Sequence, residues 1–122
     1  MKALVVDDSA VMRKILIGAL GQAGISEVGE AADGEEAVAK VEKEDFNLVL
    51  MDWNMPRMTG IDALKAMRAA GKKVPIIMVT TEAEKSRILD AIKSGASNYV
   101  IKPFDTGTIV AKVKEVLAKA SA

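Results

Sequence analysis

Hydrophobic positions along this chain alternate between short continuous runs and the three- or four-residue steps of helices. The apolar runs cover residues 3–6, 27–31, 48–51, 76–79 and 99–101. Between them lie stripes at helical spacing, such as Val11, Ile15 and Ala19, or Ile109, Val113, Val116 and Leu117. Strict alternation of strand and helix patterns predicts a parallel sheet with helices on both faces.

Polar residues and glycines support the predicted helix boundaries. They are Asp33 with Glu36, Thr59 with Asp62, Gly24 and Gly95. The two pairs resemble capping boxes, the second with Asp in the usual Glu position, and they indicate helix starts. The two glycines stand where helices are expected to end.

The composition of the five runs indicates the order of the strands. Runs 3–6, 48–51 and 76–79 are apolar throughout, as expected for strands covered on both faces. Run 27–31 is mixed and run 99–101 follows polar residues, so these two are expected at the edges. An order of 2-1-3-4-5 satisfies all five runs. The predicted fold class is therefore α/β, a flavodoxin-like doubly wound (βα)5 sheet.

Length and composition exclude several classes of function. The 122 residues fit one domain over 1–122, and half of them are hydrophobic. Lys and Arg balance Asp and Glu at 17 each, which argues against a nucleic-acid-binding domain. No apolar run approaches the roughly 18 residues of a membrane span, and Met1 leads directly into a strand pattern without a signal peptide. We therefore expect neither nucleic acid nor membrane as a partner.

The chain has neither Cys nor His, which excludes thiolate and imidazole chemistry and leaves oxygen ligands and lysine. Such residues stand at the carboxyl ends of the predicted strands, namely Asp7, Asp8, Asp52, Thr80, Thr81 and Lys102. Ligands bind at this edge of an open parallel sheet, near the point where the strand order reverses. Three converging carboxylates repel one another unless a cation neutralises them, and their hard oxygens suit Mg²⁺ or Mn²⁺ better than zinc. With Lys102 and the Thr80 hydroxyl opposite, the set predicts a site for a phosphoryl group.

Each of these residues also has an ordinary structural interpretation. Asp8 or Ser9 could cap the first long helix. Lys102 alone could be a solvated lysine, and Thr80 an ordinary hydroxyl at a strand end. Their joint placement at one edge of the sheet favours the functional interpretation.

Four segments in this order resemble the signatures of response-regulator receiver domains. They are residues 5–9 (VVDDS), 52–60 (DWNMPRMTG), 79–80 (VT) and 99–104 (YVIKPF). Segments 52–56 and 95–97 are similar to single-domain chemotaxis receivers of the CheY type in particular. Receivers are themselves an example of the 2-1-3-4-5 order, so the order and the resemblance are one expectation rather than two. One departure is Ser9-Ala10 after the acid pair, where we would expect an aromatic residue first.

The resemblance implies a role for each site residue. Asp52 would accept a phosphoryl group from a phospho-His of a sensor histidine kinase. Asp8 and Asp52 would bind Mg²⁺ (or Mn²⁺) through side chains and Asn54 through its backbone carbonyl, while Asp7 would act directly or through water.

The remaining roles concern the response to phosphorylation. Lys102, joined to Pro103 by a cis bond, would contact the phosphoryl oxygens, and Thr80 would bond to them. Tyr99 would change rotamer, and the face of the fourth helix, fifth strand and fifth helix would then bind a partner. Asn54 and Glu82 would tune how fast water removes the phosphoryl group.

The resemblance predicts a cytoplasmic, monomeric switch that catalyses only its own phosphorylation and dephosphorylation. Its output would be a protein contact, with the flagellar motor switch protein as the expected target and a phosphatase as a further partner. Three alternatives are a standalone receiver of another phosphorelay, a pseudo-receiver that binds its partner without phosphorylation, and an enzyme with an aspartyl-phosphate intermediate. Against the enzyme, haloacid-dehalogenase phosphatases use Asp-x-Asp, whereas here Asn54 lies two residues after Asp52.

Overall fold

The computed structural model describes residues 1–121, so Ala122, the last residue of the domain expected over 1–122, lies outside the described part. Strands and helices alternate along this part without exception. The strands are β1 (Lys2–Val6), β2 (Glu27–Ala31), β3 (Leu48–Met51), β4 (Ile76–Thr80) and β5 (Asn98–Ile101). The helices are α1 (Ala10–Gln22), α2 (Gly34–Lys43), α3 (Gly60–Ala69), α4 (Lys85–Lys93) and α5 (Thr106–Ala120).

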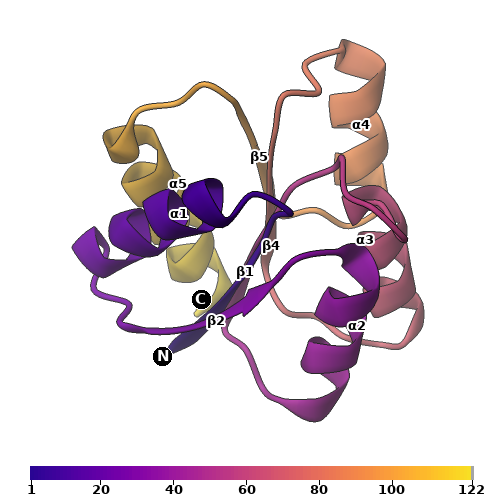
Figure 1. Cartoon of the computed structure of the whole chain (residues 1–122), viewed down its shortest axis with the longest axis horizontal. Helices are drawn as coiled ribbons and strands as arrows, with labels where there is room; N and C mark the ends of the chain where they lie inside the picture. The colour runs from indigo at the N-terminus through magenta and orange to yellow at the C-terminus, as the bar shows by residue number, and fades with distance from the viewer. Residues whose placement is uncertain (122) are drawn as a thin grey trace.

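The strands form one parallel sheet in the order β2-β1-β3-β4-β5, which confirms the predicted fold class and strand order. Helices α1 and α5 cover one face, and α2, α3 and α4 cover the other (Figure 1). Alternate strand residues face these two layers. Leu4 and Val6 pack towards α2 and α3, whereas Ala3 and Val5 pack towards α1 and α5.

Burial along the strands agrees with their places in the sheet. Every residue of β3 and β4 is buried, and so is all of β1 except its first residue. The outer strands β2 and β5 carry exposed and half-buried positions. The mixed composition of run 27–31 and the polar residues before run 99–101 therefore identified the edges correctly.

The predicted helix ends are confirmed. The Asp33 carboxylate accepts a 2.8 Å hydrogen bond from the Glu36 amide at the start of α2. The Thr59 hydroxyl accepts one of 3.3 Å from the Asp62 amide at the start of α3. The glycine that follows the C-cap of α4, Gly95, has φ of 112°, a conformation that a side chain disfavours.

The stripe of Val11, Ile15 and Ala19 in α1 is buried at only one of its three positions, Ala19. Val11 and Ile15 are 70% and 45% exposed, whereas the buried residues of this helix are Leu16, Ala19 and Leu20. Because α1 is apolar on several sides, two stripes at helical spacing compete in its sequence. Periodicity alone could not decide which of them faces the sheet.

Within residues 1–121, no helix combines the length and the apolar character needed to cross a membrane.

Candidate functional site

The register of the central strands brings their carboxyl ends level. Val6 of β1 is paired with Met51 of β3, and the next residue of each strand is an aspartate. The ladder continues for one more bond, since the Asp52 amide donates to the Val6 carbonyl over 3.0 Å. In the same way, the Lys102 amide donates to the Thr80 carbonyl over 2.9 Å. Hydrogen bonding of the sheet therefore fixes where the backbones of Asp52 and Lys102 lie, just beyond the ends of the neighbouring strands.

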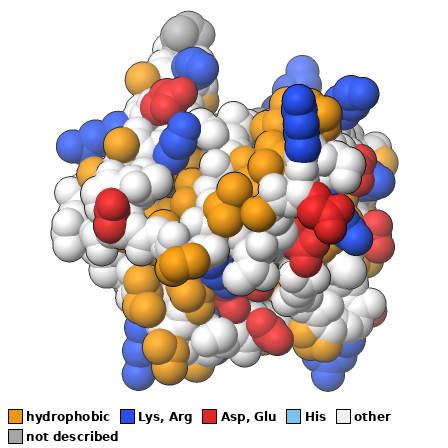
Figure 2. All heavy atoms as spheres, turned by 90° about the horizontal axis from the view of Figure 1, so that it is seen from above, with side chains coloured by type: hydrophobic (Ala, Val, Ile, Leu, Met, Phe, Trp, Pro, Cys, Tyr) orange, Lys and Arg blue, Asp and Glu red, His pale blue; other side chains and the backbone are white. Residues whose placement is uncertain are grey.

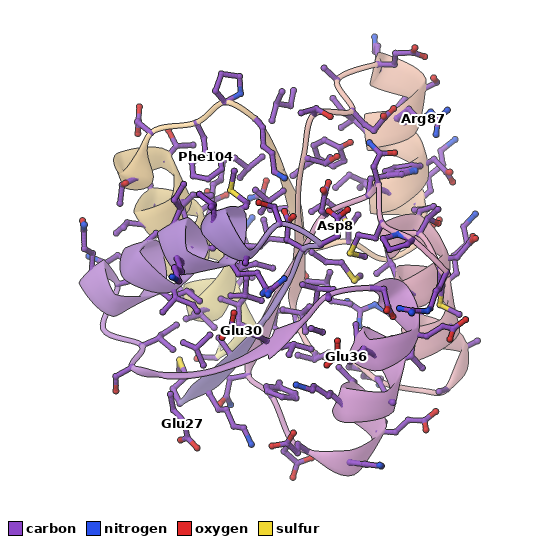
Figure 3. The ribbon with its side chains drawn as sticks, viewed as in Figure 1. Asp8, Glu27, Glu30, Glu36, Arg87 and Phe104 are labelled. Atoms are coloured by element: carbon purple, nitrogen blue, oxygen red, sulfur yellow. The ribbon has the colours of Figure 1, made fainter. Side chains whose placement is uncertain are left out.

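Three carboxylates converge at this edge of the sheet. Asp7, Asp8 and Asp52 each offer one oxygen, and these oxygens lie within 4.8 Å of one another. Asp7 and Asp52 are buried, and Asp8 is exposed. Asp8 lies near the middle of this edge in Figure 3, and Figure 2 shows acidic side chains near the middle of the same face with hydrophobic side chains beside them.

Lys102 neutralises part of this negative charge. Its Nζ lies 2.8 Å from a carboxylate oxygen of Asp7 and 3.3 Å from one of Asp52. Burial lowers the pKa of Lys102, but the hydrogen bond to Asp7 and the charges of Asp52 and Asp7 outweigh it, so the pKa is raised overall. The Lys102–Pro103 bond is cis, as the resemblance implied. Lys102 is thus held as a cation between the two buried acids rather than solvated.

Backbone amides bind the second carboxylate oxygen of each buried acid, the one that does not contact Lys102. Asp7 Oδ1 accepts from the Ser9 amide (2.9 Å), and Asp52 Oδ1 accepts from the Trp53 amide (2.7 Å). Helix α1 is capped by Ser9, whose hydroxyl accepts from the Met12 amide over 3.2 Å. Since Ser9 serves as the cap, capping does not explain the presence of Asp8.

The donor set fits a small, hard divalent cation. Opposite ligands of an octahedral Mg²⁺ lie roughly 4.2 Å apart, twice the Mg–O distance of about 2.1 Å. Adjacent ligands lie closer, roughly 3 Å apart, so the oxygens of the three aspartates, which lie within 4.8 Å of one another, would draw together around a bound ion. With net negative charge left after Lys102, these oxygens suit a hard divalent cation such as Mg²⁺ or Mn²⁺.

The other predicted site residues gather around Glu82, in the segment between β4 and α4. The Asn54 amide group donates to the Glu82 carboxylate over 2.9 Å. The backbone amide of Glu82 donates to the Thr80 hydroxyl over 3.3 Å, and its carbonyl accepts from the Tyr99 hydroxyl over 2.6 Å. Burial, helped by the charge of Glu82, raises the pKa of Tyr99 to about 12. The predicted residues therefore form two groups. One consists of the three acids with Lys102, and the other of Asn54, Thr80 and Tyr99 around Glu82. The groups are adjacent in the chain, because Asn54 lies two residues after Asp52.

Sequence reasoning missed Arg87 on α4. Its guanidinium lies 5.3 Å from the centre of the Trp53 ring, and its Nε lies 3.7 Å from the Glu82 carboxylate (Figure 3 labels Arg87). Arg87 thereby links α4 to Trp53, the residue after Asp52, and to Glu82. A single Arg in a helix rich in charges carries no sequence signal for such a contact.

The fold and the site together define a doubly wound α/β domain with an acidic, lysine-containing centre at the point where its strand order reverses. Residues 3–114 match the family model described as response regulator receiver domain. The chain therefore belongs to the response-regulator receiver family.

Similar proteins carry chemotaxis names. Chemotaxis protein CheY1 of Helicobacter pylori (strain J99) is 43% identical over 120 residues, 96% of this chain and 97% of that protein. Chemotaxis protein CheY-3 of Vibrio cholerae is 40% identical, over 98% and 93%. Among solved structures, the CheX–CheY–BeF3–Mg²⁺ complex of Borrelia burgdorferi matches with a TM-score of 0.91 and 30% identity, over 95% of this chain and 88% of that one. The chain is thus a CheY-like receiver.

Proposed function

We propose that Asp52 accepts a phosphoryl group from the phospho-His of a sensor histidine kinase, in a receiver domain that spans residues 1–122. The observation that carries this proposal is the placement of Asp52, a buried carboxylate that contacts Lys102 and lies close to Asp7 and Asp8. Such a carboxylate can act as a nucleophile, and cations beside it can stabilise added negative charge.

In the proposed reaction, a carboxylate oxygen of Asp52 attacks phosphorus while the bond from phosphorus to the kinase imidazole breaks. The imidazole then takes up a proton as it leaves. Lys102 stabilises the charge on the phosphoryl oxygens, and Thr80 turns its hydroxyl towards them. A Mg²⁺ held by Asp7, Asp8, Asp52 and the Asn54 carbonyl would supply further charge neutralisation.

Dephosphorylation reverses the switch. A water molecule attacks phosphorus, the bond to Asp52 breaks, and the carboxylate and inorganic phosphate are the products. Asn54 and Glu82, bonded to each other over 2.9 Å, are the residues proposed to set access and orientation of this water. The chain would therefore catalyse only its own phosphorylation and dephosphorylation.

The proposed output is a protein contact in the cytoplasm, with the flagellar motor switch protein as the target. Exposed hydrophobic side chains of the α4–β5 face, Leu89, Ile92 and Ile101, could pack against such a partner. The chemotaxis names of similar proteins favour this target over the output of another phosphorelay. Stronger binding of the beryllofluoride-loaded protein than of the free protein to the motor switch protein of the same organism would support the choice, and equal binding would contradict it.

Phosphorylation by acetyl phosphate tests the acceptor directly. With Mg²⁺ present, intact-mass analysis should show one added phosphoryl group, which EDTA should prevent. Asp52→Asn should remain unlabelled, whereas Asp62→Asn, which alters an exposed carboxylate on α3, should label as the parent does. Full labelling of Asp52→Asn would overturn the assignment.

A further inference from the structure

The segment that joins β3 to α3, residues 52–59, is held to the body of the domain at two places. Near its start, the Trp53 carbonyl accepts from the amide of Gly60, the first residue of α3, over 2.8 Å. Near its end, the Met58 carbonyl accepts from the Gly34 amide at the start of α2 over 3.1 Å. The segment includes Asn54, whose carbonyl is a proposed Mg²⁺ ligand, so whatever holds it also positions this ligand.

An ion pair reinforces the second attachment. Nη1 of Arg57 donates to Asp33 Oδ2 over 2.7 Å. The Asp33 side chain is only 7% exposed, whereas that of Arg57 is 66% exposed. The other carboxylate oxygen of Asp33 caps α2 through the Glu36 amide. Asp33 therefore joins two elements, the start of α2 and the segment beside the acidic site.

The backbone of Arg57 indicates that its side chain is what this position requires. Its φ is +65°, the left-handed region, which costs a residue with a side chain roughly 1–2 kcal/mol and glycine very little. A glycine would fit this backbone without strain but could not reach Asp33. The contact with Asp33 offsets the strain, and it does so at the segment that carries Asn54.

We propose that Arg57 and Asp33 are positioning residues for the magnesium site, and that their ion pair holds residues 52–59 so that Asn54 stays beside Asp52. Neither residue contacts the three acids in the proposed role. They act through the backbone of the segment, as partners behind the ligands of a metal commonly do. This inference rests on the proposed Mg²⁺ site and assigns a function to a residue, Asp33, that sequence reasoning treated only as a helix cap.

Two variants remove the ion pair with little other damage. Arg57→Gly relieves the backbone strain and deletes the cation. Asp33→Asn keeps a good N-cap for α2 but loses the negative charge. Lys93→Gln, which removes an exposed cation on α4, is the matched control for loss of charge. Arg57→Lys keeps the charge, so its Mg²⁺ affinity should lie between that of Arg57→Gly and that of the parent.

Mg²⁺ binding is the measurement, followed by the fluorescence of Trp53, the only Trp, and independently by calorimetry. We expect the Mg²⁺ dissociation constant to rise about 3- to 10-fold in each variant, less than the 10- to 100-fold typical of buried partners behind metal ligands. The double variant should be no weaker than either single one, because both remove the same contact. Urea unfolding in EDTA should show that all variants remain folded under the conditions of the titration.

The outcomes separate this inference from the function on which it rests. Unchanged Mg²⁺ affinity in Arg57→Gly and Asp33→Asn, with binding lost in Asp8→Ala, would overturn the positioning role and leave the metal site standing. Additive losses in the double variant would also overturn it. Absence of saturable binding in the parent, or binding unaffected by Asp8→Ala, would overturn the metal site and the positioning role together.

Discussion

The hydroxyl of Tyr99 on β5 donates a 2.6 Å hydrogen bond to the backbone carbonyl of Glu82, which follows β4. The backbone amide of Glu82 in turn donates a hydrogen bond to the Thr80 hydroxyl at the end of β4. Glu82 therefore connects the Thr80 hydroxyl at the end of β4 with the aromatic ring of Tyr99 at the edge of the sheet. A shift at either end has a direct path to the other through one peptide segment.

Tyr99 should make stability depend on pH in the alkaline range. In the unfolded chain its hydroxyl ionises near pH 10, whereas burial keeps it protonated up to about pH 12 in the folded protein. The folded state then binds the proton more tightly, so this stabilisation is complete below pH 10 and is lost as pH rises to about 12. Tyr99→Phe should be less stable at neutral pH by about 0.5–1.5 kcal/mol, the usual value of a hydrogen bond.

Urea unfolding of the parent and of Tyr99→Phe across this range is the measurement. The lysines titrate in both proteins, so the difference between the two curves isolates Tyr99. We expect the difference in free energy of unfolding between the parent and Tyr99→Phe to narrow from pH 10 to 12. A constant difference would mean that the Tyr99 hydroxyl ionises at its ordinary pKa.

Gly60 should not tolerate any side chain. A Cβ at this position would lie 1.8 Å from the carbonyl oxygen of Asp52, a backbone atom that cannot move away without displacing the acceptor residue. We expect Gly60→Ala to lower the free energy of unfolding by about 3 kcal/mol or more and to slow labelling by acetyl phosphate. Gly18→Ala is the control, since its Cβ would meet nothing within 4 Å inside α1, and it should stabilise by roughly 0.5–1 kcal/mol. Urea unfolding that leaves Gly60→Ala as stable as the parent would contradict the close approach.

The fold could be predicted from the sequence because each level of the pattern agreed with the others. Apolar runs without interruption marked the central strands, and mixed runs marked the edges. Since the register of parallel strands places their carboxyl ends together, Asp7, Asp52 and Lys102 could be expected at one site before any coordinates. The sequence pattern of α1 singled out Val11 and Ile15, which are exposed, because that helix offers two apolar faces and only packing selects one.

Contacts between side chains far apart in the sequence could not be predicted. Nothing in the sequence places Arg87 on Trp53 or Arg57 on Asp33, since each contact depends on where α4 and α2 dock. The left-handed backbone of Arg57 was equally hidden, because a glycine is the usual signal for that conformation. Sequence thus predicted the chemical groups of the site but not what holds them in place.

Asp8 should stabilise the protein only when Mg²⁺ is present. Lys102 is engaged by Asp7 and Asp52, so the charge of Asp8 adds repulsion to the cluster. In EDTA, Asp8→Asn should raise the free energy of unfolding by about 1 kcal/mol, the scale of two charges about 4 Å apart with the dielectric constant of bulk water, which surrounds the exposed Asp8. In excess Mg²⁺ the parent should become more stable than Asp8→Asn, because Mg²⁺ binding stabilises the parent and hardly stabilises the variant.

Urea unfolding with EDTA or with Mg²⁺ measures both halves of this prediction. Asp62→Asn, which also removes one exposed carboxylate, should show no reversal. If Mg²⁺ raised the free energy of unfolding equally in the parent and in Asp8→Asn, the cation would have to bind elsewhere.

A phosphoryl group on Asp52 should act on the α4–β5 face through Thr80. Such a group adds about −1.5 to −2 charge and three acceptor oxygens. The Thr80 hydroxyl is fully buried at the end of β4 and now accepts from the Glu82 amide. Turning towards the new oxygens would weaken that bond, move the Glu82 peptide and so disturb its bond to Tyr99.

Thr80→Ala should therefore separate phosphorylation from its consequence. Without the hydroxyl, Asp52 should still bind beryllofluoride, but the NMR shifts of the Tyr99 ring and of residues 85–93 should be smaller than in the parent. Thr80→Ser keeps the hydroxyl and should retain most of the response, which controls for the small cavity left by the methyl group. Since Tyr99 reaches Glu82 through a backbone carbonyl, substitution of the Glu82 side chain by Gln should leave this route intact. Equal shifts in Thr80→Ala and the parent would show that the signal reaches the α4–β5 face without passing through Thr80.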